Sequence, residues 1–150
     1  MIVEQISVFI ENKEGRLSEI AEVLAKNDIN ISALSLADTE EYGVLRMIVS
    51  EPYRAKDVLN ANGVIGKVTD VIAVAIDDEP GGFSSALKRI TDEGIFIKYM
   101  YACMSHKKGK ALMILAVSDV EKAEQIVKLG EANMEEPSSI YRITEKKKKN

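Results

Sequence analysis

The stretch ENKEGRLSEIAEVLAKNDINISAL at residues 11–34 returns as DDEPGGFSSALKRITDEGIFIKYM at residues 77–100. Setting Gly15 on Gly81 gives an offset of 81 − 15 = 66 residues, which needs no gap. The same offset aligns a later segment, with Gly43 on Gly109, Met47 on Met113, Ile48 on Ile114 and Val49 on Leu115. Because solenoid repeats run to roughly 20 to 50 residues, a unit of this length is better interpreted as a small domain. Two copies account for nearly the whole chain.

Length and composition set the outer limits. The chain has 150 residues, which fits one domain or two small ones. From the repeat we expect a first domain at residues 1–69, a second at 70–144 and a disordered basic tail at 145–150. Hydrophobic residues at 46% and charged residues at 29% are typical of a folded globular protein. The formal net charge of -4 disfavours nucleic acids and anionic membranes as partners.

Cysteine and histidine are scarce. With one Cys and one His, the chain can form neither an internal disulfide nor a zinc cluster of the Cys and His type. We therefore expect no metal, no cofactor and a reducing, cytoplasmic location. The N-terminal apolar run carries Glu4 and lacks a basic leader, and no stretch approaches the roughly 18 apolar residues of a membrane span. Neither secretion nor membrane insertion is expected.

Runs of β-branched residues predict the strands. The run at 2–10 is expected to be a strand buried on both faces, and the run at 64–76 to close the first sheet and open the second. Two hairpins complete the pattern. Their strands are expected at 29–37 and 44–49 in the first copy, and at 96–104 and 111–117 in the second.

Periodicity predicts two helices in each copy. The apolar residues with helical spacing are Leu17, Ile20, Ala21 and Leu24 in the first copy and Phe83, Ala86, Leu87 and Ile90 in the second. Pro52 suits the first turn of a following helix, and Ser118 with Glu121 predicts a capping box for its counterpart. The order β-α-β-β-α-β, repeated, predicts an α+β fold of two ferredoxin-like units, each with both helices on one face of an antiparallel sheet.

The links at 11–16 and 77–82 join the first strand of each copy to its first helix. At a helix start the backbone N–H groups lack intrahelical partners and the dipole is positive, so a carboxylate or phosphate can dock there. The nearby polar groups are the amides of Asn12 and Asn30 and the carboxylates of Glu11, Asp77, Asp78 and Glu79. Together they suit a zwitterion. Alternatively, the glycines only allow a tight turn and the acids only favour a helix start.

Other constellations are weaker. Cys103 and His106 could act as thiolate and base, but no third orienting group is identifiable, which favours packing. The PGG run at 80–82 lacks the Lys-Ser or Lys-Thr of a phosphate loop. On the expected strand at 96–104, one face carries Tyr99 and Tyr101 and the other Met100 and Met104. These side chains either pack or line a ligand pocket.

These features resemble the ACT domain, a small regulatory module of amino-acid metabolism, in a stand-alone tandem form. The segment at 11–34 is similar to the family's usual segment, in which an acidic or amide residue and then Pro-Gly precede an amphipathic helix and a strand that starts with Asn-Ile. The segment at 77–102 carries the same pattern. Glu14 stands where the family has Pro, and Phe96 stands where it has Asn. The resemblance covers about residues 2–130.

The resemblance implies two units side by side in an eight-stranded antiparallel sheet. It also implies amino acids bound where the first link of one unit faces the second-strand start of the other. Carried over by position, one site comprises Glu11, Asn12, Gly15, Arg16 and Leu17 with Phe96 and Ile97. The other comprises Asp78, Pro80, Gly81, Gly82 and Phe83 with Asn30 and Ile31.

Two classes of function follow from the resemblance. The first is a non-catalytic, allosteric regulator or sensor whose small-molecule ligand is an L-amino acid and which is compatible with a homodimer. The second is a regulatory interaction subunit that docks on a biosynthetic enzyme such as acetolactate synthase and keeps only a vestigial ligand site. An acylphosphatase-like enzyme on the same fold would need an anion loop rich in Arg, and the link at 11–16 has one Arg. We therefore expect no catalysis.

Overall fold

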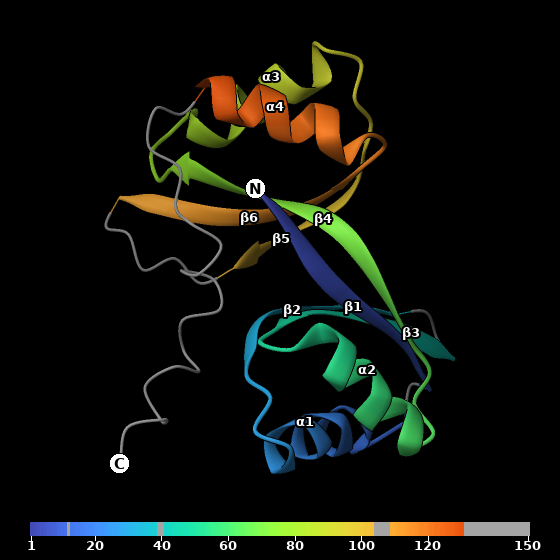
Figure 1. Cartoon of the computed structure of the whole chain (residues 1–150). Coiled ribbons are helices and arrows are strands. Elements are labelled where there is room, and N and C mark those ends of the chain that lie inside the picture. Colours follow the sequence, from blue (N-terminus) through green and yellow to red (C-terminus); the bar gives the residue numbers. More distant parts are fainter. Residues whose placement is uncertain (12, 39–40, 104–108, 131–150) are drawn as a thin grey trace, which may run out of the picture. The chain divides into compact units, whose positions relative to one another are not determined.

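The computed structural model describes residues 1–11, 13–38, 41–103 and 109–130, which contain six strands and four helices (Figure 1). In chain order these are β1 (Ile2–Glu11), α1 (Arg16–Lys26), β2 (Ile31–Asp38), β3 (Tyr42–Val49), α2 (Pro52–Ala61), β4 (Gly66–Asp77), α3 (Gly82–Thr91), β5 (Ile97–Cys103), β6 (Lys110–Val117) and α4 (Val120–Gly130). The described chain forms two compact units. The first unit comes from residues 4–69, and the second from residues 1–3 and 70–130. Within the described ranges, no helix has the length and apolar character to cross a membrane.

Hydrogen bonds join the strands in the order β2-β3-β1-β4-β6-β5. The ladders of β3 with β1 and β2, and of β6 with β4 and β5, are all antiparallel. The α+β class is confirmed, but the eight strands implied by the family resemblance become six among the described residues. The run at 64–76 forms one long strand, β4, whereas the prediction of eight strands counted it twice, once for each unit. The closing strand expected after α4 would lie outside the described residues.

The beginnings of β1 and β4 each complete the sheet of a unit. In the second unit the Met1 amino group donates a hydrogen bond to the Ala73 carbonyl (3.2 Å), and the Ala73 N–H donates to the Met1 carbonyl (2.8 Å). This two-way exchange is characteristic of an antiparallel pair. In the first unit Gly66 lies beside β1, because a Cβ built on it would be 3.1 Å from Val8 Cγ1. Each unit therefore obtains a fourth strand position from within the described chain.

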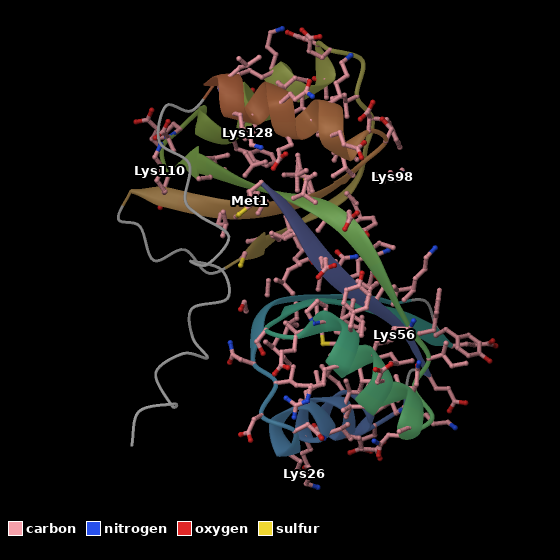
Figure 2. All side chains as sticks on the ribbon, viewed as in Figure 1. Met1, Lys26, Lys56, Lys98, Lys110 and Lys128 are labelled. Atoms are coloured by element: carbon pink, nitrogen blue, oxygen red, sulfur yellow. The ribbon has the colours of Figure 1, made fainter. Side chains whose placement is uncertain are left out.

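Glu124 on α4 holds the start of β1 in the second unit. Its Oε1 accepts a hydrogen bond from the Ile2 N–H (3.1 Å) and lies 3.9 Å from the Met1 amino nitrogen. Its Oε2 lies 2.8 Å from Lys128 Nζ; Met1 and Lys128 are labelled in Figure 2. The hydrogen bond from Lys128 is the main cause that lowers the pKa of Glu124, against the opposing effect of burial. The carboxylate is thus held in its charged form.

The repeat offset of 66 residues fails in the second half of each unit. Both edge strands carry an irregularity after their first residue, and in each case that residue pairs with the end of the next strand: Ile31 with Val49, and Ile97 with Val117. These partners are 49 − 31 = 18 and 117 − 97 = 20 residues apart. The ungapped alignment of Gly43 with Gly109 is therefore wrong. The second hairpin contains two additional residues. Gly43 pairs with Ile10, and Ala111 pairs with Ile76, the counterpart of Ile10 in the second copy. Gly43 is therefore equivalent to Ala111.

The start of α4 also differs from expectation. Asp119, not Ser118, caps the helix, because Asp119 Oδ1 accepts a hydrogen bond from the Lys122 N–H (2.9 Å). Ser118 Oγ instead accepts a hydrogen bond from the Phe96 N–H (3.0 Å). The predicted capping box of Ser118 with Glu121 is wrong for this reason. Pro52 does begin α2, as its position indicated.

Each unit has its own core between its helices and one face of its sheet. The first core comprises Ile6, Val8, Ile10, Ile20, Leu24, Ile29, Leu45, Met47, Val49, Ala55, Leu59 and Val64. The second comprises Ile72, Val74, Ile76, Ala86, Ile90, Ile95, Leu115, Val117, Ala123 and Val127. Two expectations are corrected. Ala21 is exposed while Val23 packs on the core, and β1 is not buried on both faces throughout, because Phe9 is 69% exposed.

Candidate functional site

Both links reach their helix through a glycine in the left-handed backbone region. Gly15 has φ +81° and Gly81 has φ +92°, values that a side chain disfavours. Neither helix start receives a side-chain cap. The Arg16 N–H donates to the Lys13 carbonyl (3.2 Å) and the Gly82 N–H to the Glu79 carbonyl (3.1 Å), so an anion at either link would dock on the remaining N–H groups of the first turn.

The first link borders a hollow of about 450 Å³. Its lining residues are Phe9, Glu11, Lys13, Glu14, Arg16, Glu19 and Gly63. This volume lies within the roughly 300 to 1,000 Å³ that is usual for small-molecule sites. Three carboxylates and two cations share the lining, so both ends of a zwitterion can find a charge of opposite sign.

Two ion pairs organise the lining of this hollow. Lys13 pairs with Glu11, and Arg16 Nη1 lies 2.9 Å from Glu19 Oε2. The hydrogen bond from Lys13, followed by the charge of Lys13, lowers the pKa of Glu11. Phe9, Lys13, Glu14, Glu19 and Gly63 line the hollow but were not among the residues predicted for the site. The i,i+3 spacing of Arg16 and Glu19 is a sequence signal that could have indicated one of them.

The second link is more tightly connected to its sheet. Lys110, labelled in Figure 2, lies with its Nζ 2.5 Å from Asp77 Oδ1. The Asp78 N–H donates a hydrogen bond to the Gly109 carbonyl (3.1 Å). A Cβ built on Gly82 would lie only 2.2 Å from the Asp77 carbonyl oxygen, so only glycine fits there. This link folds closely against the end of β4.

The two second-strand starts share one hydrogen-bond arrangement. The Asn30 N–H donates to Ser50 Oγ (3.1 Å), and the Ser50 N–H donates back to the Asn30 carbonyl (2.9 Å). Phe96 makes the same two bonds with Ser118, at 3.0 and 2.9 Å. The change from Asn to Phe therefore leaves the backbone arrangement intact. The Phe96 side chain is 68% exposed.

The predicted site residues divide between the two units. The first unit holds Glu11, Gly15, Arg16, Leu17, Asn30 and Ile31, and the second holds Asp78, Pro80, Gly81, Gly82, Phe83, Phe96 and Ile97. Asn12 lies outside the described residues, as do His106 and Met104. The implied combinations of one link with the other unit's strand start remain predictions.

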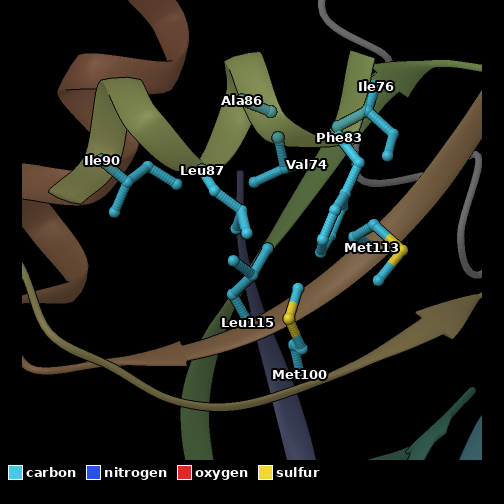
Figure 3. A pocket seen from close by; sticks show the side chains of 9 residues that line it. All are labelled: Val74, Ile76, Phe83, Ala86, Leu87, Ile90, Met100, Met113 and Leu115. Atoms are coloured by element: carbon cyan, nitrogen blue, oxygen red, sulfur yellow. The ribbon is translucent and has the colours of Figure 1, made fainter. Parts of the chain in front are cut away.

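A second cavity lies under α3 in the second unit (Figure 3). Its lining is entirely apolar: Val74, Ile76, Phe83, Ala86, Leu87, Ile90, Met100, Met113 and Leu115. The free volume is about 10 Å³, close to the space for a single water molecule. This cavity is too small for an amino acid. Met100 and Phe83 pack around it.

Comparison with known proteins identifies relatives that cover most of the chain. The sequence pattern of one family, the ACT domain pair, matches residues 1–142. The crystal structure of protein BT0572 from Bacteroides thetaiotaomicron is 36% identical, with a TM-score of 0.85 and coverage of 95% of this chain and 97% of that one. A comparison with curated proteins gave no match.

Two further solved structures are similar in fold. The regulatory subunit of aspartate kinase from Thermus thermophilus, in its ligand-free form, is 15% identical with a TM-score of 0.64, covering 86% of this chain and 96% of that one. The regulatory subunit from Thermus flavus is 13% identical with a TM-score of 0.62, covering 86% and 94%. At these identities the likeness shows the fold alone.

Proposed function

Because the chain belongs to the family of ACT domain pairs, we propose that it is a non-catalytic regulatory protein that binds an L-amino acid. The fold shared with two regulatory subunits of aspartate kinase supports a regulatory role. In this proposal the protein acts in the cytoplasm, consistent with a cysteine that makes no disulfide. Its effect on metabolism is exerted through the amino acid that it senses.

The observation that carries this proposal is the hollow at the first link. Its lining combines cations, carboxylates and an uncapped helix start within one unit. The carboxylate of an amino acid would dock on the N–H groups of the first turn of α1 and on Arg16. The ammonium group would meet the carboxylates of Glu11 and Glu14.

Thermal unfolding with each of the twenty common L-amino acids tests the proposal. A ligand at about 100 times its dissociation constant adds roughly 2.7 kcal/mol to the stability of the folded state, so the melting temperature should rise visibly. Gly15→Val places a branched side chain at a left-handed backbone position beside the docking carboxylate, so it should weaken binding. Gly81→Val tests the other link. If no amino acid at millimolar concentration stabilises the wild type, the proposal is wrong.

A second candidate function is docking on a biosynthetic enzyme such as acetolactate synthase. The observation that favours it is a pair of strongly exposed apolar side chains in the first unit, Phe9 at 69% and Ile65 at 77%. Strongly exposed apolar side chains are a feature of interaction surfaces. Cosedimentation with purified acetolactate synthase tests this function, and Ile65→Ser should abolish the complex. Amino-acid binding should survive that substitution, because Ile65 does not line the hollow.

A further inference from the structure

The two links differ at the first helical position. Arg16 begins α1, whereas Gly82 begins α3 at the equivalent place. In the second link, a Cβ at this position would lie 2.2 Å from the Asp77 carbonyl oxygen. Arg16 carries a Cβ, so the first link must keep its helix start farther from the equivalent carbonyl of Glu11. The first link is therefore open and the second is closed.

The second link is bonded to the start of β6. Asp77 forms an ion pair with Lys110, and the Asp78 N–H donates a hydrogen bond to the carbonyl of Gly109, the residue before β6. In the first link the Lys13 N–H donates to the Glu11 carbonyl (2.9 Å), and the Arg16 N–H donates to the Lys13 carbonyl (3.2 Å). The Arg16 bond has a counterpart in the second link, where the Gly82 N–H donates to the Glu79 carbonyl (3.1 Å). The hollow of about 450 Å³ lies beside the first link.

Arg16 is placed to use this hollow. Its side chain is 32% exposed, and Nη1 is held 2.9 Å from Glu19 Oε2. A guanidinium has five N–H donors in a planar fork, so a carboxylate can still bind it through two parallel hydrogen bonds. Glu19 fixes the orientation of the fork before the ligand arrives. Glu14 also lines the hollow and makes no ion pair with another described residue, so its carboxylate can accept an ammonium group.

We propose that the first link alone captures the amino acid, with Arg16 as the clamp for its carboxylate, and that the second link is a structural connection. The chain then binds one ligand, although it contains two copies of the motif. This inference rests on the proposed function and specifies which of its two candidate sites operates.

Calorimetric titration of the full chain tests the inference, with the amino acid that raises the melting temperature most among the twenty common L-amino acids. We expect one ligand per chain. Arg16→Gln should weaken binding by about tenfold or more, since it removes a charged bidentate contact. Arg16→Lys should fall between wild type and Arg16→Gln, because an ammonium keeps the charge without the fork.

The chain offers a matched control in Arg54, whose Nη1 lies 2.8 Å from Glu51 Oε1 in an exposed i,i+3 pair away from the hollow. Arg54→Gln should leave the affinity unchanged. Two ligands per chain, or equal affinities of Arg16→Gln and Arg54→Gln, would overturn the inference while leaving the proposed function in place. Absence of binding to the wild type would overturn both, and is recognised by the missing heat of binding before any variant is compared.

Discussion

Helices α1 and α3 cover their sheets with different side chains at equivalent positions. Where α1 buries Ile20 at 1% exposure, α3 has the smaller Ala86 at 7%. In the second unit Phe83, Leu87 and Met100 pack into the surrounding space and leave a cavity of about 10 Å³ (Figure 3). The repeat thus preserves the apolar pattern and not the individual volumes, because neighbouring side chains can repack around a smaller one.

The largest effect should come from giving the first unit the alanine that the second unit has at the equivalent position. Ile20→Ala should lower the free energy of unfolding by about 2 to 5 kcal/mol, because the neighbouring Ala21 is exposed and cannot fill the space. Denaturant unfolding monitored by circular dichroism measures the loss. Ala21→Ser is the control and should stay within about 0.5 kcal/mol. A loss below about 1 kcal/mol for Ile20→Ala would show that the first unit repacks as readily as the second.

The links provide the next comparison. Gly82→Ala should cost about 1 to 3 kcal/mol of folding stability, because the new methyl group meets the backbone of Asp77. Arg16→Ala should cost less than about 1 kcal/mol, as is usual for an exposed ion pair. Thermal unfolding of both variants measures the difference. Equal losses would contradict the division into an open and a closed link.

The second helices differ in their caps. Asp119→Ala should cost about 1 kcal/mol, because it removes the hydrogen bond to the Lys122 N–H. Glu51 precedes α2 without a side-chain cap, so Glu51→Ala should change the free energy of unfolding by less than about 0.5 kcal/mol. Urea unfolding separates the two. A larger loss of stability for Glu121→Ala than for Asp119→Ala would favour the predicted capping box of Ser118 with Glu121 over a cap by Asp119.

The smallest effect concerns pH. The pKa of Glu124 is lowered from 4.5, so its charge stabilises the fold above that pH, and the contribution is lost as the pH falls through the folded pKa. Glu124→Gln should cost about 0.5 kcal/mol at neutral pH. The gap to wild type should shrink in acid below pH 4.5, as measured by unfolding at several pH values. Glu22→Gln, in the exposed pair with Lys26, is the control. A gap that is constant with pH would contradict the ionic role.

Elements with local signals were predicted well. The stripe of Ile20 and Leu24, the first-turn Pro52 and the glycine-ended links all depend on residues close in the sequence, and the structure bears them out. The hollow at the first link was missed in part. Gly63 joins its lining from the far end of α2, and local patterns carry no information about that approach.

The sequence-based predictions were wrong where a residue contacts a partner that lies far away in the sequence. Ser118 looked like a helix cap, but its hydroxyl accepts a hydrogen bond from Phe96, which lies 22 residues earlier. The alignment of Gly43 with Gly109 looked natural because glycine matched glycine. Strand pairing instead makes Ala111 the equivalent residue, through its contact with Ile76.

The amino-acid sequence by itself determined the repeat, the order of helices and strands and the apolar face of each, because periodicity and turn residues act over a few positions. Only the tertiary structure decided which strands complete each sheet, which link is open and which polar groups cap or pair. Met1 with Ala73 and Gly82 with Asp77 show the reason. Hydrogen bonds and steric limits within a unit depend on which backbone segments come together, and that is settled only when the unit has folded.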